Sequence, residues 1–140
     1  MGWTGVCDAV GDTAWFGTNK GRIYKTTDKG ANWTVQTTGE DNVSRISMTN
    51  GQEGFIIAQV TNQQGQVESW AMRKTTDGGN NWDVVPVSAQ DQPSDISAVP
   101  GHEGMIISVK ISQTTEQNFS AYSMDYGVTW TEIDDSVQYT

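Results

Sequence analysis

The sequence predicts an all-β fold made of three repeated units, and three observations lead to this prediction. An eight-residue turn frame occurs three times, with its tryptophans at positions 33, 82 and 130. The spacing of 49 and then 48 residues is typical of β proteins built from repeats. The composition includes 15 Gly, only 3 Pro and 18% charged residues, which suits short strands joined by tight turns.

The repeated frame reads Ser or Thr, any residue, Asp, any residue, Gly, two further residues and Trp. An Asp side chain can bond backbone N–H groups two residues on, Gly adopts a positive φ without steric cost, and Trp restarts an apolar strand. Each copy is therefore expected to form the tip of a β-hairpin. The defined positions are Thr26, Asp28, Gly30 and Trp33, then Thr75, Asp77, Gly79 and Trp82, then Ser123, Asp125, Gly127 and Trp130.

All four defined positions match in every copy, and the frame resembles the Asp-box (BNR) repeat. That repeat occurs in sialidases, sortilin-type receptors, xyloglucanases and photosystem assembly factors, all of which are β-propellers. The resemblance implies that each unit is one propeller blade. It also implies that Asp28, Asp77 and Asp125 fix turns rather than act as catalysts, and that the three tryptophans pack in the core or between blades.

Each unit is expected to contain four antiparallel strands, within a single repeat domain spanning residues 1–140. The three units cover about residues 1–40, 41–90 and 91–140. The expected strands are 5–10, 13–18, 22–26 and 33–37, then 43–48, 54–60, 69–75 and 82–87, then 95–99, 104–111, 119–123 and 130–133.

The second strand of each unit decides between two architectures. It carries continuous apolar runs at 15–16, 55–58 and 105–107, where a half-exposed strand would alternate. Both faces of each sheet should therefore be buried, as in a propeller, where every blade lies between two others. A β-trefoil is the alternative, since it also has three repeats of this size and closes within one chain.

Three blades do not close a ring, because a closed propeller typically takes about four to eight. Two open blade faces would expose more apolar surface than a soluble monomer normally shows. Two copies would supply six blades, so we predict a head-to-tail homodimer in which blade 3 of each chain packs on blade 1 of the other. The prediction holds if the sequence is not a fragment of a longer propeller.

Charge and composition restrict the partners. The chain has 17 acidic and 8 basic residues, and the resulting net charge of −9 disfavours nucleic acid and anionic membrane surfaces. We expect a soluble chain of unknown compartment, because no signal peptide or membrane-spanning run is apparent. Cys7, the only cysteine, is expected to be a small buried strand residue. No set of residues suggests a metal or a cofactor.

Antiparallel connectivity places the loops on two opposite faces. The loops between second and third strands, together with the connectors between units, form the face with longer polar segments. Their side chains can bond sugar hydroxyls or a peptide backbone, and an aromatic residue near their base offers a stacking surface. The candidate ligand-binding residues are Asp41, Asn42, Gln63, Gln64, Trp70, Gln90, Asp91, Glu116 and Asn118.

We expect no catalytic residues. Sialidases hold the substrate carboxylate with three arginines and use a Tyr–Glu nucleophile pair, and no motif for the arginine near that family's N-terminus is present. Glu53 and Glu103 recur at one position in two units, which favours a structural role. His102 lies in a turn beside glycines and is expected to be exposed. Arg45 and Asp95 occupy matching first-strand positions and are expected to form an ion pair lining a central channel.

These observations favour a non-enzymatic binding module whose polar-loop face recognises a glycan or a protein segment. Two alternatives stay open. In the first, the chain is part of a glycoside hydrolase propeller, such as a sialidase or xyloglucanase, and its catalytic residues lie on other blades. In the second, the chain is a purely structural, engineered or excised propeller fragment.

Overall fold

The computed structural model of the chain describes residues 6–87, 93–111 and 118–133, apart from the side chains at 94, 110, 111, 118 and 119. These residues form only strands, turns and bends. Within them, no helix has the length and apolar character that crossing a membrane would require.

Twelve strands form three four-stranded sheets, which we call blades 1, 2 and 3. Blade 1 contains β1 (Cys7–Val10), β2 (Thr13–Gly17), β3 (Arg22–Thr26) and β4 (Thr34–Thr37). Blade 2 contains β5 (Asn42–Met48), β6 (Gly54–Thr61), β7 (Val67–Thr75) and β8 (Asp83–Val85). Blade 3 contains β9 (Pro93–Ala98), β10 (Ile106–Ile111), β11 (Asn118–Ser123) and β12 (Thr131–Glu132).

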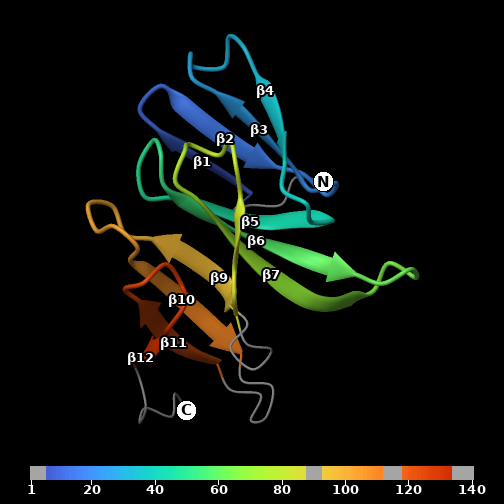
Figure 1. Ribbon diagram of the computed structural model, residues 1–140, viewed down its shortest axis with the longest axis vertical. Helices are drawn as coiled ribbons and strands as arrows, with labels where there is room; N and C mark the ends of the chain where they lie inside the picture. Colours follow the sequence, from blue (N-terminus) through green and yellow to red (C-terminus); the bar gives the residue numbers. More distant parts are fainter. Residues whose placement is uncertain (1–5, 88–92, 112–117, 134–140) are drawn as a thin grey trace.

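The strands of each blade are antiparallel neighbours in chain order, and the three blades are stacked face to face along the long axis of the molecule (Figure 1). The predicted fold of three four-stranded antiparallel blades is therefore confirmed. The three sheets remain separate and do not close into one barrel, so the trefoil alternative is wrong.

The strand ends differ from the expected ones around the tryptophans. Trp33, Trp82 and Trp130 belong to the turns, and the fourth strand of each blade begins one residue later than predicted. The fourth strand of blade 2 also stops at Val85, because the next residue, Pro86, has no N–H to donate to a sheet. By contrast, β7 begins two residues earlier than predicted and has nine residues.

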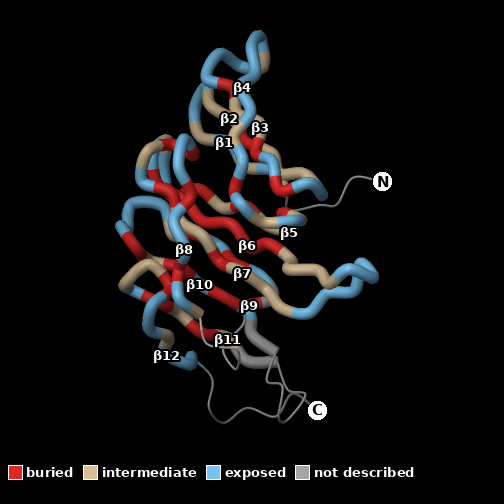
Figure 2. The backbone as a smooth tube through the Cα atoms, turned by 45° about the vertical axis from the view of Figure 1, so that its right-hand side comes forward, coloured by how far each residue is buried: buried red, intermediate tan, exposed pale blue. Residues whose placement is uncertain are grey.

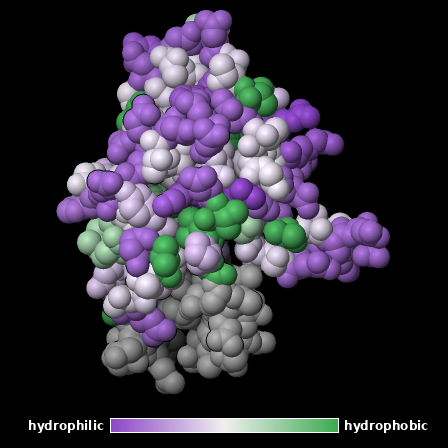
Figure 3. Space-filling view, viewed as in Figure 1, coloured by the Kyte–Doolittle hydropathy of each residue, from purple (hydrophilic) through white to green (hydrophobic). Residues whose placement is uncertain are grey.

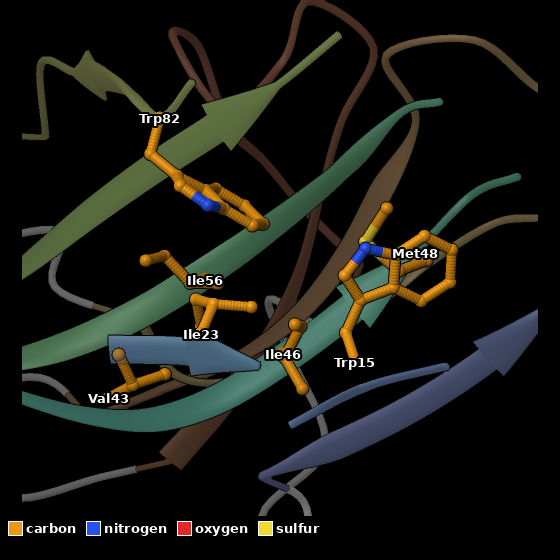
Figure 4. Close-up of a cluster of buried hydrophobic side chains, with 7 residues drawn as sticks. All are labelled: Trp15, Ile23, Val43, Ile46, Met48, Ile56 and Trp82. Carbon is orange, nitrogen blue, oxygen red and sulfur yellow. The ribbon is translucent and has the colours of Figure 1, made fainter. Parts of the chain in front are cut away.

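The apolar core lies between blades rather than within them. Between blades 1 and 2, Trp15 and Ile23 of blade 1 meet a set of side chains from blade 2 (Figure 4). The members from blade 2 are Val43, Ile46, Met48, Ile56 and Trp82. The indole Nε1 of Trp15 also donates to the carbonyl oxygen of Gly78 at 2.9 Å, which links the two blades by a buried hydrogen bond.

A second apolar cluster joins blades 2 and 3. Blade 2 contributes Phe55, Ile57, Met72 and Val85, and blade 3 contributes Ile96, Ala98 and Ile106. Since successive strand residues point to opposite faces, Ile56 packs toward blade 1 while its neighbour Ile57 packs toward blade 3. The continuous apolar run of β6 is thereby explained, and buried residues follow this strand through the middle of the stack (Figure 2).

The two end blades bury only one face within a single chain. Phe16 of blade 1 is half-buried and Ile107 of blade 3 is exposed. The equivalent residues of β6, Ile56 and Phe55, are fully buried. Cys7, which we expected to be buried, is exposed, because its side chain lies on the outer face of blade 1 in register with Phe16. The expectation that both faces of every blade are covered therefore holds for blade 2 alone.

We predict that Ile57→Ala lowers the free energy of unfolding by about 2–5 kcal/mol, since it removes buried methyl groups and leaves a cavity between blades 2 and 3. Val84→Ala on the exposed side of β8 is the matched control, with a change within about 0.5 kcal/mol. Urea denaturation followed by tryptophan fluorescence measures both. Equal effects at the two positions would contradict this location of the core.

Candidate functional site

The polar-loop face contains a projecting arm, the β6–β7 hairpin. This hairpin extends beyond the rest of the stack (Figure 1), and its tip is hydrophilic (Figure 3). Inside the tip, Asn62 Oδ1 accepts hydrogen bonds from the backbone N–H groups of Gln64 and Gln66 at 3.0 and 2.9 Å. Gln63 and Gln64, two of the predicted ligand-binding residues, are exposed on this hydrogen-bonded turn.

Asp41 and Asn42 connect blade 1 to the same hairpin. Asp41 Oδ2 accepts hydrogen bonds from the backbone N–H and the hydroxyl of Thr61, at 3.4 and 3.2 Å. The Asn42 amide donates to Gln59 Oε1 at 2.7 Å. Both residues lie on the predicted face, and these bonds give them a supporting role at the base of the arm.

Trp70 lies on β7, paired across the strands with Gln59, and it is half-buried. Its ring packs against the apolar cluster between blades 2 and 3, so only the uncovered part of the ring is left to contact a ligand. Three other predicted residues, Gln90, Asp91 and Glu116, lie outside the described residues, and so does the side chain of Asn118.

Among the described residues, the strand β7 has an edge at the base of the arm that no other strand covers. β8 pairs only with residues 72–74 of β7. In the described part of the chain, residues 67–71 are therefore paired on one side only, with β6. Their outward N–H and C=O groups, next to Trp70, could pair with another strand. Sequence reasoning missed this edge, although Pro86 was the signal that β8 had to be short.

The aspartate turns occupy the opposite face and share one hydrogen-bond pattern. In the turn of blade 2, the Thr75 hydroxyl donates to Asp77 Oδ1 at 2.9 Å and accepts from the N–H of Gly79 at 2.8 Å. The same carboxylate accepts the backbone N–H of Asn81 at 2.9 Å and the Asn81 side-chain amide at 2.7 Å. The carboxylate thus reaches four residues along the chain, rather than the two expected from the sequence.

The other two turns repeat this geometry with small changes. Asn32 donates twice to Asp28 in blade 1, and Thr129 donates twice to Asp125 in blade 3. The residue before each tryptophan is thus a side-chain hydrogen-bond donor. The sequence frame placed no restriction on this position. The frame glycines all have positive φ, between 85° and 91°. In all three turns these aspartates accept hydrogen bonds within the turn and these glycines adopt the left-handed backbone conformation.

These hydrogen bonds change the acidity of the turn aspartates. Donation from the side chain and backbone of Asn81 lowers the pKa of Asp77 to about 2. The equivalent bonds from Asn32 lower the pKa of Asp28 to about 2, and those from Thr129 lower the pKa of Asp125. Carboxylates stabilised in their ionised form in this way act as fixed acceptors, not as proton donors near neutral pH.

Each aspartate turn is also bonded to the turn between the first and second strands of its own blade. The N–H of Gly78 donates to the carbonyl oxygen of Gln52 at 2.7 Å. In blade 3 the N–H of Tyr126 donates to the carbonyl oxygen of Gly104 at 3.0 Å, and blade 1 has the equivalent bond. The expectation that these two sets of turns share one face is confirmed.

Two ion pairs join neighbouring blades. Arg45 Nε and Asp95 Oδ1 are 3.0 Å apart, between the first strands of blades 2 and 3, which confirms the predicted pair. A second pair, Arg73 with Glu40 at 2.7 Å, lies between blades 1 and 2 and was not predicted. Arg73 Nη1 also donates to the carbonyl oxygen of Trp82 at 3.0 Å, so this largely buried side chain fixes the connector between the blades.

The glutamates that recur in the sequence have structural partners. Buried Glu53 accepts the backbone N–H of Gly104 from the next blade at 2.9 Å, and Glu103 accepts the hydroxyl of Tyr126 at 2.5 Å. This second bond is the main reason that the pKa of Tyr126 is raised to about 12. His102 is exposed, as expected. No group of three or more potential metal-ligating side chains gathers in the described ranges.

No protein-family model and no curated protein sequence matches this chain. Solved structures with a similar fold include two of YCF48. YCF48 from Cyanidioschyzon merolae superimposes with a TM-score of 0.68 at 19% identity, over 91% of this chain and 35% of that one. YCF48 bound to D1 peptide gives 0.64 at 18% identity, over 98% and 43%. A GH74 xyloglucanase from Xanthomonas campestris is more distant, with a TM-score of 0.49 at 11% identity over 89% and 28%.

The chain therefore spans less than half the length of either YCF48 structure. At these identities the likeness concerns the fold alone. Together with the stacked four-stranded sheets, it establishes that the three units are β-propeller blades.

We predict that acid weakens the fold through the aspartate turns. Because the folded-state pKa of Asp77 lies below its ordinary value of 3.8, its contribution is fully present above pH 4 and is lost as the pH falls toward 2. Asp77→Asn should lower the free energy of unfolding by about 1–2 kcal/mol at pH 7. The variant should also show a smaller further decrease in the free energy of unfolding between pH 4 and pH 2 than the unmodified protein.

The measurement is urea denaturation at pH 7, 4 and 2.5. Asp83→Asn on the neighbouring strand β8 is the matched control, because Asp83 is exposed and lies outside the turn network. If the two variants showed the same pH dependence, the turn carboxylate would not be the acid-sensitive group.

Proposed function

We propose that this chain is a non-enzymatic binding module that holds an extended protein segment on its polar-loop face. The single observation that carries the proposal is the edge of β7 at residues 67–71, which no described strand covers. Adding a strand to an exposed sheet edge is a common mode of peptide recognition, in which main-chain hydrogen bonds supply affinity. A glycan has no such ladder of alternating donors and acceptors, so a protein segment suits the edge better.

The side chains around the edge suggest the character of the segment. Trp70 supplies an aromatic surface beside the edge, while Gln66 and Glu68 are exposed at its outer end. The net charge of −9 makes the whole chain attractive to positively charged partners at low salt. We therefore propose a segment that carries Lys or Arg opposite Glu68.

The similar structures give this proposal independent support. One of the two YCF48 structures is of a complex with D1 peptide, so a protein of this fold is able to bind a peptide.

The absence of enzymatic activity is part of the same proposal. The turn aspartates are held ionised by hydrogen bonds, and Glu53 and Glu103 are engaged by structural donors. Hydrolysis of a glycoside needs two carboxyl groups facing each other across the scissile bond. We further propose that the three hydrogen-bonded turns make the chain a member of the Asp-box propellers.

The proposed module works as a ring of six blades made by two copies of the chain. Three blades fall below the number that closes a propeller, and six lie within the usual range. A closed ring would hold the two β6–β7 arms in fixed positions, one from each copy.

The proposal is tested with an array of extended peptides, a glycan array and a fluorogenic glycoside. Binding to Lys- or Arg-containing peptides is expected, without glycan binding or hydrolysis. Hydrogen exchange of amides 67–71 should slow when the best peptide is bound, because those N–H groups become paired.

A pair of charge reversals locates the site. Glu68→Lys should weaken binding of the best peptide about tenfold, because it places like charges opposite each other. Asp83→Lys makes the same change in net charge at the aspartate-turn end of blade 2 and should alter binding less than about twofold. Equal losses of peptide affinity in both variants would show that binding depends only on net charge and not on the β7 edge. Hydrolysis of the glycoside would overturn the proposal that the chain is not an enzyme.

A further inference from the structure

The contacts between blades repeat at equivalent positions, beginning with the first strands. Between blades 1 and 2, Asp8 Oδ2 accepts the backbone N–H of Met48 at 2.6 Å. Between blades 2 and 3, Ser47 Oγ accepts the backbone N–H of Ala98 at 2.8 Å. Asp8 pairs with Trp15 and Ser47 pairs with Phe55 at matching places in their sheets, so both bonds belong to one repeated joint.

The two halves of this joint are present at opposite ends of the molecule. On blade 3, Ser97 occupies the acceptor position, because it pairs with Ile107 as Ser47 pairs with Phe55. On blade 1, Ala9 occupies the donor position that Ala98 fills in blade 3, and its N–H donates within the single chain to Asp8 Oδ1 at 2.8 Å, a bond that the joint would exchange for Ser97. Both Ser97 and Ala9 are exposed.

The front face of blade 1, meaning the face turned away from blade 2, carries the apolar half of a joint. Trp82 of blade 2 is 6% exposed, whereas the equivalent Trp33 is 44% exposed. Ile46 is likewise buried at 6%, and its equivalent in blade 1 is exposed Cys7. Phe16 contacts Trp33 edge to face, with ring centroids 5.2 Å apart, so the face is aromatic and preformed.

The back face of blade 3, meaning the face turned away from blade 2, carries the other half. Phe55 of blade 2 is fully buried, whereas the equivalent Ile107 is 41% exposed. Val85 is 4% exposed, and its equivalent Ile133 is 53% exposed. Ile107 and Ile133 are therefore apolar at positions that are covered in blade 2, where a following blade is present.

A lysine–tyrosine contact adds chemical complementarity. In blade 2, Lys74 Nζ lies 4.5 Å from the ring centroid of Tyr126, which belongs to the aspartate turn of blade 3. Tyr122 holds the position of Lys74 in blade 3, and Lys29 holds the position of Tyr126 in blade 1. Placing blade 3 before blade 1 would therefore restore the same cation–π pair with the two residues exchanged.

We propose that the occupant of both faces is a second copy of this chain, joined head to tail. The back face of blade 3 in each copy packs on the front face of blade 1 in the other, and two identical joints close the ring. This inference rests on the six-bladed ring proposed above and names the residues that make it. Cys7 becomes a buried joint residue, equivalent to Ile46 and Ile96.

The unmodified chain provides the first test. Light scattering should give twice the chain mass of 15.3 kDa, with no larger species. Because Cys7 is the only cysteine, its reaction with a thiol reagent reports the joint directly, and it should slow about tenfold or more as the protein concentration rises through the dimer dissociation range. A monomer whose thiol reacts equally fast at all concentrations overturns the proposal.

A matched pair of variants tests the face. Ile107→Asp should convert the dimer to a monomer with fast Cys7 reaction. Val84→Asp should leave the dimer intact, since Val84 is 64% exposed on a blade that is covered on both sides. Circular dichroism of both variants checks that the blades remain folded. Dimers that persist in folded Ile107→Asp overturn the proposed joint.

Cross-linking separates a closed ring from an open chain of copies. In a Cys7→Ser background, Ala9→Cys and Ser97→Cys should become linked across both joints and give a covalent species of two chains only. A ladder of longer species would show an open polymer and overturn ring closure. These readouts need no peptide, so a chain that dimerises but binds no segment would overturn the binding function and leave the joint standing.

Discussion

Burial on both faces of one sheet is the constraint on which the rest of this structure depends. Ile56 and Ile57 are adjacent in β6 and fully buried, yet they point to opposite sides of the sheet. Each needs its own apolar partner, which an antiparallel sheet with one wet face does not supply. The blades must therefore stack, and stacking places the first strands, the turns and the loops of all three units in register.

The two ends of the blades are used differently. At one end, carboxylates, hydroxyls and glycines bind each other and the neighbouring turn, so most of their hydrogen-bonding capacity is occupied within the fold. At the other end, the β6–β7 arm extends beyond its sheet, with exposed amide side chains and a strand edge that no described strand covers. This division explains why the repeated motif, although it attracts attention in the sequence, is a poor guide to where a partner binds.

Much of the fold could be predicted from local patterns, because each blade is made of neighbouring strands joined by short turns. The three-fold frame located the turns, and the apolar runs predicted stacking. Exposure of Cys7 was not predictable, because it depends on whether a blade lies in front of blade 1. The edge of β7 at residues 67–71 and the Arg73–Glu40 pair depend on strand length and on contacts between blades, which a single sequence pattern does not encode.

The covered position of the middle sheet also affects how the molecule opens. Within a single chain that has not joined a second copy, blades 1 and 3 each have one neighbour, while β6 is enclosed by both. Local unfolding of that chain therefore costs least at the ends of the stack. Amide protons should then exchange with solvent fastest in the outer sheets and slowest in β6. Partial proteolysis would follow the same gradient, with terminal blades trimmed before the centre is reached.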